Sequence, residues 1–242
     1  MAGHSKWANI KHRKGRADLI KGKIFSRITK EIITAVKLGG PDPKSNSRLR
    51  LVMLKAREAN MPSENIERNI KKASSADQAD FSEFTYEMYG YGGVGLILDI
   101  MTDNKNRISS DIRIAMNKKG GTLASPGAVA YNFDQKGVIQ VLKTNGNEDE
   151  LFLAVSEAGA DEFETEEEMY IITTPPDLLF QVKEAIDKRG IKCESADLQR
   201  IPKVTVECSS EDQKANLELI EYLEGLDDID AVHHNMKLLS LQ

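Results

Sequence analysis

Apolar residues recur every three or four positions through the first third of the chain, which is the spacing of amphipathic helices. This pattern predicts three short helices, over about residues 18–38, 47–59 and 63–73. Ser45 or Asn46 can cap the second helix and Ser63 the third, because such side chains accept hydrogen bonds from free N–H groups of a first turn. Three such helices form a small bundle, and the polar segment 74–80 is expected to link it to the next part of the chain.

After residue 80 the apolar pattern alternates between strands and helices. Residues 137–198 follow the order strand, helix, strand, strand, helix, strand, which is the βαββαβ unit of ferredoxin-like folds. The segments on either side of this unit predict a second sheet. Its strands are expected at about 84–89, 94–101, 128–133, 204–208 and 229–233, and its helices at about 105–119 and 211–223.

The sequence therefore predicts the α+β class with three domains: an N-terminal three-helix bundle and two ferredoxin-like α/β domains, one inserted in the other. A basic arm and the helical bundle are expected over residues 1–76. A discontinuous α/β middle domain would combine residues 77–134 with 201–242, because the last helix and strand are needed to complete its sheet. The acidic ferredoxin-like domain, residues 135–200, would be the insertion.

The formal net charge of −5 hides two regions of opposite sign. Residues 1–72 contain 18 Lys and Arg against 6 Asp and Glu, a net charge of +12, whereas residues 73–242 contain the other 15 against 32, a net charge of −17. Between Thr144 and Val182 there is no Lys or Arg, so this stretch repels a phosphate backbone. The basic segment therefore predicts a nucleic-acid partner, DNA or ribosomal RNA, and the acidic domain predicts a basic protein as its partner.

The candidate nucleic-acid contacts are the cations of the N-terminal arm, of the first helix on the side away from its apolar face, and of the two following helices. Trp7 can stack on an unpaired base or can hold the arm against the protein. The full set is Lys6, Trp7, Lys11, His12, Arg13, Lys14, Arg16, Lys21, Lys23, Arg27, Lys30, Arg48, Arg50, Lys55, Arg57, Arg68, Lys71 and Lys72.

The sequence favours binding over catalysis. Residues 90–95 match the letters GxGxxG, but a strand rather than a helix follows them, so a tight turn is favoured over a dinucleotide site. The four histidines and two cysteines lack metal-ligand spacing, and no nucleophile motif is present, so we expect no enzyme activity, no cofactor and no metal. Neither a leader nor a membrane-spanning apolar run is found, which predicts a cytoplasmic protein.

Several long segments of the chain closely resemble the YebC family of bacterial and organellar proteins. The resemblance covers essentially the full length and implies a small helical domain followed by two α/β domains. The matching segments are AGHSKWANIKHRK (2–14), GKIFSRITKEI (22–32), NSRLRL (46–51), KAREANMPSENIERNIKKA (55–73), TDNKNR (102–107) and KKGGTL (118–123).

This resemblance implies two alternative functions, neither of them catalytic in the usual sense. One is a DNA-binding transcriptional regulator, whose affinity depends on base sequence. The other is a ribosome-associated translation factor that assists peptide-bond formation on difficult sequences such as proline runs; the mitochondrial relative is a translational activator. The absence of an evident recognition helix with Arg, Asn and Gln together, and of a dimerising heptad, favours the second alternative. The usual description of the family favours the first, which is our leading prediction.

Overall fold

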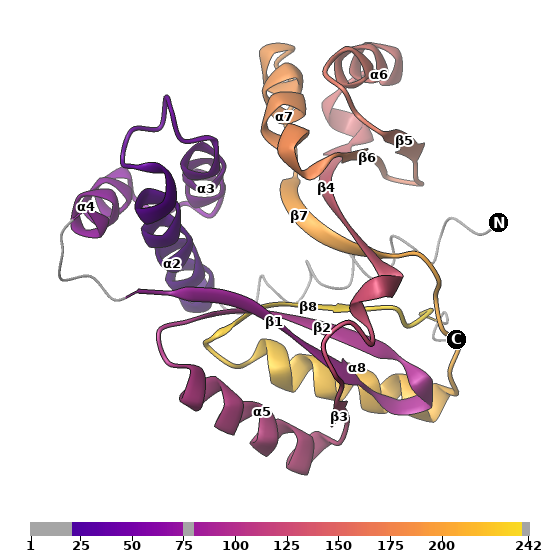
Figure 1. Cartoon of the computed structure of the whole chain (residues 1–242). Helices are drawn as coiled ribbons and strands as arrows, with labels where there is room; N and C mark the ends of the chain where they lie inside the picture. The colour runs from indigo at the N-terminus through magenta and orange to yellow at the C-terminus, as the bar shows by residue number, and fades with distance from the viewer. Residues whose placement is uncertain (1–20, 75–79, 239–242) are drawn as a thin grey trace. The chain divides into compact units, whose positions relative to one another are not determined.

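The computed structural model describes residues 21–74 and 80–238 (Figure 1). The chain divides into two compact units, one formed by residues up to Phe133 together with those from Pro202 onward, and the other by Asp134–Ile201. A group of helices followed by two four-stranded sheets with their own helices confirms the predicted α/β fold class. Within the described ranges no helix is long and apolar enough to cross a membrane.

The first unit opens with three helices, α2 (Lys21–Gly39), α3 (Ser47–Glu58) and α4 (Ser63–Ala73). Ile32, Leu49 and Ile66, one from each helix, are almost fully buried where the three helices meet. Asn46 caps α3 by accepting a hydrogen bond from the backbone N–H of Leu49 at 2.9 Å, as one of the two predicted caps. Its side-chain amide also donates to the carbonyl of Ala35 in α2 at 2.8 Å, so one residue fixes the α2–α3 corner.

The predicted Ser63 cap is wrong. The residue before α4 is Pro62, whose extended backbone already supplies the capping conformation. The Pro62 carbonyl accepts hydrogen bonds from the backbone N–H groups of Asn65 at 2.9 Å and Ile66 at 3.2 Å. Ser63 is therefore the first helical residue, and its side chain does not cap the helix.

The first unit also contains an antiparallel sheet with the strand order β3-β1-β2-β8. Helices α5 and α8 cover one face of this sheet (Figure 1), where Leu98 of β2 meets Ile112 of α5 and Leu219 of α8. Because β8 pairs with β2, the end of the chain completes the sheet, as predicted. The elements are β1 (Ser82–Tyr89), β2 (Gly95–Thr102), α5 (Lys105–Lys119), β3 (Thr122–Leu123), α8 (Ser210–Glu224) and β8 (Ile229–His234).

The glycine-rich segment between β1 and β2 forms the predicted tight turn. Gly92 and Gly93 have φ angles of 64° and 77°, which favour glycine because other residues are strained there. Asn216 of α8 accepts from the backbone N–H of Tyr91 at 2.8 Å and donates to the Tyr91 carbonyl at 3.0 Å. The turn is therefore fixed to the helix layer by a side chain more than 120 residues away in sequence.

The strand predicted over residues 128–133 is wrong. Residues Ala130–Asn132 form a 3-10 turn, and only Phe133 belongs to a strand. The cause is the buried carboxylate of Glu87 in β1, which accepts hydrogen bonds from three backbone N–H groups that a strand would use for its ladder. The donors are Gly127, Val129 and Ala130, at 2.6, 2.6 and 2.8 Å.

The strand predicted over residues 204–208 is also wrong, because only one parallel bridge forms, between Val206 and Met236. The side chain of Asn132 occupies the backbone polar groups of Val204. It donates to the Val204 carbonyl at 2.8 Å and accepts from the Val204 N–H at 3.0 Å. A side chain thus takes the place of a neighbouring strand.

The second unit is a four-stranded sheet with the order β5-β6-β4-β7, which is the strand order of the predicted βαββαβ unit. Leu151 and Val155 of α6, and Val182 and Ile186 of α7, are fully buried in the core of this unit. The elements are β4 (Phe133–Leu142), α6 (Glu148–Glu157), β5 (Glu162–Thr165), β6 (Met169–Thr174), α7 (Leu179–Lys188) and β7 (Ser195–Pro202).

The Glu87 contact yields a stability prediction. We expect Glu87→Gln to lower the free energy of unfolding by about 1–3 kcal/mol, because an amide has one acceptor oxygen and presents its NH₂ group to backbone donors. Urea unfolding at neutral pH measures the change. Glu83→Gln, on the same strand but at the surface, is the control and should cost less than about 1 kcal/mol. Equal losses for the two variants would contradict this role of Glu87.

Candidate nucleic-acid interface

The cations predicted to contact nucleic acid fall into four groups. The seven arm residues Lys6, Trp7, Lys11, His12, Arg13, Lys14 and Arg16 lie outside the described residues. Lys21 and Lys23 belong to the first turn of α2, and their side chains lie outside the described part as well. The other nine are placed by the structure, which assigns them to three different surroundings.

Arg27 and Lys30 of α2 are directed at the sheet of the same unit. Arg27 donates to the backbone carbonyl of Ile229 at 2.8 Å and to that of Glu224 at 3.3 Å. Lys30 donates to the carbonyl of Asp227 at 2.8 Å and forms an ion pair with Asp228 at 3.2 Å. The side of α2 away from the bundle core is therefore a packing surface at these two positions, where the sequence pattern predicted a solvent-facing cationic stripe.

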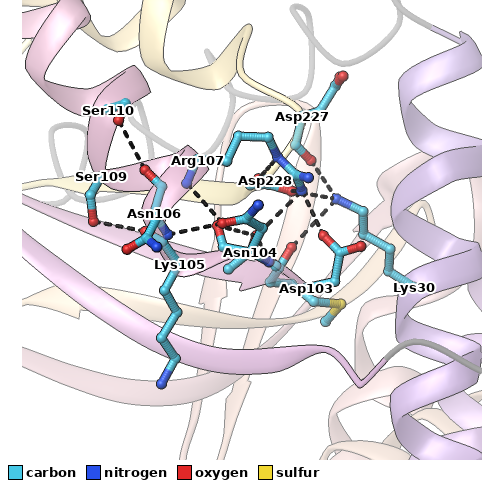
Figure 2. A network of polar contacts seen from close by, with 12 residues as sticks. Lys30, Asp103, Asn104, Lys105, Asn106, Arg107, Ser109, Ser110, Asp227 and Asp228 are labelled. Atoms are coloured by element: carbon cyan, nitrogen blue, oxygen red, sulfur yellow. Dashed lines mark hydrogen bonds and ion pairs between the residues drawn. The ribbon is translucent and has the colours of Figure 1, made fainter.

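Asp228 is the centre of this contact (Figure 2). Its side chain is 2% exposed and accepts two hydrogen bonds from Arg107, from Nε and from Nη2, both at 2.8 Å. Arg107 also pairs with Asp103 at 2.7 Å, and Asn104 caps α5 by accepting from two backbone N–H groups. The segment TDNKNR (102–107) thus begins α5 and binds the carboxylate that holds α2. We call Lys30, Asp228 and Arg107 the Asp228 clamp.

The charges in the Asp228 clamp stabilise one another. Burial raises the pKa of the Asp228 carboxyl, but hydrogen bonds from Arg107, Lys30 and Thr102 outweigh burial and lower that pKa below its ordinary value. The hydrogen bonds of Arg107 to Asp228 and then to Asp103 raise the pKa of the guanidinium well above its usual range. All three members of the clamp are therefore charged at neutral pH.

Three more predicted contacts are partly buried and have partners in the protein. Arg48 pairs with Glu83 of β1, and Lys55 pairs with Glu31 of α2 at 3.2 Å. Arg50 donates to the backbone carbonyls of Pro43 and Lys44 at 2.8 and 2.7 Å. These cations stabilise the bundle and its corner loop.

The last four predicted contacts, Arg57, Arg68, Lys71 and Lys72, are exposed on α3 and α4. Arg68 donates to Asn65 at 2.8 Å, one turn away. The described residues contribute no hydrogen bond or ion pair to the side chains of Arg57 and Lys71. Three of these four lie in the last turns of their helices, where the helix dipole also favours positive charge. They are the part of the predicted set that the structure leaves open to a phosphate backbone.

The sequence interpretation overlooked the cations of α5. Of the 15 Lys and Arg after residue 72, five lie in this one helix, at positions 105, 107, 113, 118 and 119, together with a single acid, Asp111. The net charge of the last 170 residues is strongly negative, and summing over so long a stretch hid this helix. A charge sum over single elements would have found it.

The second unit is acidic, with 16 Asp and Glu against 7 Lys and Arg in residues 134–201. Two large apolar side chains of α6, Phe152 and Leu153, are 52% and 54% exposed, and Phe152 packs edge-on against Phe163 of β5. Acidic residues lie on both sides of them along the helix, including Asp149 and Glu157. The surface of this helix therefore combines apolar and negative groups.

Groups that could support catalysis or metal binding are sparse. Cys193 and Cys208 are both free thiols, and His233 pairs with Asp99 at 2.9 Å. Within residues 21–74 and 80–238, no three His, Cys, Asp or Glu side chains are grouped as metal ligands.

Comparison with known proteins identifies the family. The model of the TACO1/YebC N-terminal domain matches residues 5–76, and that of the TACO1/YebC second and third domain matches residues 81–236. These bounds cover most of the chain, so an arrangement of basic helices followed by two sheet domains is the family's architecture. The protein belongs to the TACO1/YebC family, as the sequence resemblance indicated.

The relatives carry regulatory names. A protein of Protochlamydia amoebophila, named a probable transcriptional regulatory protein, is 66% identical over 98% of this chain and 97% of its own length. One of Chlamydia muridarum with the same description is 54% identical over 98% of this chain and its own full length. The crystal structure of a conserved hypothetical protein from Aquifex aeolicus, 40% identical, matches with a TM-score of 0.83 over 93% of this chain and 94% of that one.

The Asp228 clamp yields a second prediction. We expect Asp228→Asn to lower the free energy of unfolding by about 3 kcal/mol at pH 7, because Lys30 and Arg107 would lose their buried counter-charge. A lowered native pKa stabilises the fold above the unfolded-state pKa of about 3.9, and this contribution is lost as pH falls through the lower native value. The difference between wild type and variant should therefore shrink below about pH 4.

Urea unfolding at pH 7 and pH 3 checks this expectation. Asp103→Asn is the matched control, because Asp103 also pairs with Arg107 but is 39% exposed; it should cost less than about 1 kcal/mol. An Asp228→Asn loss that stays the same at both pH values would exclude the ion pairs as its cause.

Proposed function

We propose that this protein is a cytoplasmic DNA-binding transcriptional regulator without catalytic activity, which holds DNA phosphates with its basic N-terminal segment, residues 1–72. The observation that carries this proposal is the charge distribution, +12 in the first 72 residues and −17 in the rest. Such a concentration of like charge repels itself, and neutralisation by a polyanion relieves that repulsion. The regulatory names of the relatives agree with this function.

The structure supports a division of work among the predicted cations. Arg27 and Lys30 are engaged with the sheet, so their role is to position the helices. Arg57 and Lys71 are exposed and point to a different role, in which they contact phosphates together with the arm. Phosphate contacts of this kind position a protein on DNA without reading its sequence.

The proposal predicts a strong dependence of duplex DNA affinity on salt. If about six phosphates are neutralised, the logarithm of the association constant should fall against the logarithm of salt concentration with a slope near −5. The triple variant K11A/R13A/K14A should bind more weakly, and its slope should be less steep by about 3, because three counterion-releasing contacts are removed. Fluorescence anisotropy with a labelled 30-base-pair duplex measures both quantities.

The matched control is K188A/R189A/K192A, which removes three exposed cations from the acidic unit and so changes the net charge equally. It should leave the slope and the affinity unchanged. An affinity independent of salt, or equal losses in the two triple variants, would refute the proposed role of the basic segment.

The cellular target is tested by crosslinking in cells, followed by sequencing of the bound nucleic acid. Enrichment of promoter DNA supports the transcriptional function. Enrichment of ribosomal RNA would instead establish the alternative, a ribosome-associated translation factor, and would overturn the DNA proposal.

For the acidic unit we propose a basic protein as partner. The support is the combination of exposed Phe152 and Leu153 with surrounding carboxylates, which suits a basic segment carrying an apolar side chain. Poly-L-lysine serves as a simple probe: the full-length variant D149N/E157Q should bind it more weakly than wild type at low salt. Unchanged binding would show that this helix is not the contact surface.

A further inference from the structure

Helix α5 is positively charged within an acidic sheet domain, and its exposed side has a regular composition. Its buried side chains Ile108, Ile112 and Ala115 face the sheet and α8. At 100° per residue, the positions i, i+4, i+7 and i+11 starting from Asn106 lie within about 60° of one another and almost opposite this buried face. These positions are Asn106, Ser110, Arg113 and Asn117, which we call the α5 row.

All four residues of the α5 row are exposed. The Ser110 hydroxyl donates to the carbonyl of Asn106 within the helix. The described part of the chain offers no hydrogen-bond partner to the side chains of Asn106, Arg113 and Asn117. One guanidinium and two amides therefore point outward with their donors and acceptors unused.

The helix that presents this row is held at both ends. At its start, Asn104 caps the first turn and Arg107 binds Asp228. At its end, Lys119 pairs with Glu218 of α8 at 3.1 Å, and Gly120 closes the helix. Figure 1 shows α5 beside α8 on one face of the sheet, with its other side turned away from the sheet. The α5 row is thus a rigid, convex surface.

We propose that α5 is a recognition helix: the α5 row reads base edges in the major groove of duplex DNA. Arg is suited to guanine O6 and N7, and Asn to adenine N6 and N7, because each pair can form two hydrogen bonds. Ile114, beside the row and 44% exposed, can contact a thymine methyl group. The inference deepens the proposed function and rests on it, since it assumes a DNA partner.

The geometry favours duplex DNA over duplex RNA. A B-form major groove is about 12 Å wide and admits one α-helix, whereas the major groove of A-form RNA is too narrow for side chains to read. The 15-residue α5 is about 22 Å long, which is enough to follow the groove over several base pairs.

The charges beside the α5 row are also suitable. Lys105 and Lys118 are exposed on opposite sides of it, where they can meet the phosphates that border a groove. Each is supported by an aromatic ring, Phe84 at 5.4 Å and Tyr222 at 5.5 Å. Of the nearby carboxylates, Glu218 is neutralised by Lys119, and Asp111 lies toward the buried side of the helix.

The test is a selection from a library of randomised DNA duplexes with the full-length protein. Wild type should enrich a sequence motif. The variant R113A/N117A should lose the preference at the base pairs that these side chains read and bind the wild-type motif about 10-fold or more weakly. Its affinity for a duplex lacking the motif should change less than about 3-fold. Both residues are exposed and alanine favours helix, so the variant should fold normally.

Two comparisons separate this inference from the proposed function. K214A removes an exposed cation from α8 of the same domain and should leave the motif intact. K11A/R13A/K14A should weaken binding to all duplexes without changing the motif; if it has no effect, the proposed function itself fails. The recognition role of α5 is overturned if R113A/N117A enriches the wild-type motif, if wild type enriches no duplex motif, or if only a randomised RNA library yields one.

Discussion

The buried carboxylate of Asp228 is the constraint on which the arrangement of the first unit depends. It receives hydrogen bonds from Lys30 of the helical bundle and from Arg107 at the start of α5, so one anion joins three segments that are far apart in sequence. A carboxylate that is 2% exposed is stable only when it is paired in this way. The bundle, the start of α5 and the turn before β8 are therefore positioned together or not at all.

This constraint changes the meaning of the positive charge in the N-terminal segment. Cations of one helix have two different tasks: Arg27 and Lys30 satisfy carbonyls and a carboxylate inside the protein, while the exposed cations of α3 and α4 remain available to solvent. Net charge alone does not distinguish these tasks. The inward-facing cations keep the exposed ones in a fixed relation to the sheet and hence to α5, which lies on the same unit.

The sequence predicted the elements whose apolar spacing is regular, because period and burial follow directly from each other; α5 was expected over 105–119 and spans those residues. It failed where a distant side chain takes over backbone groups, as Glu87 does for residues 127–130 and Asn132 for Val204. The candidate site was predictable as a concentration of charge, but not as a geometry. The partner of Lys30 lies 198 residues away, and no local pattern reveals it.

The position of β8 in the sheet has a consequence for biosynthesis. The strand that completes the first sheet, and the aspartate just before it, are among the last fifteen residues of the chain, whereas the acidic unit is contiguous and precedes them. Since domains fold as units while the chain is made, the acidic unit can fold during translation, but the first unit cannot be completed until synthesis ends. A truncated product would therefore carry the full set of N-terminal cations without the anion that organises them.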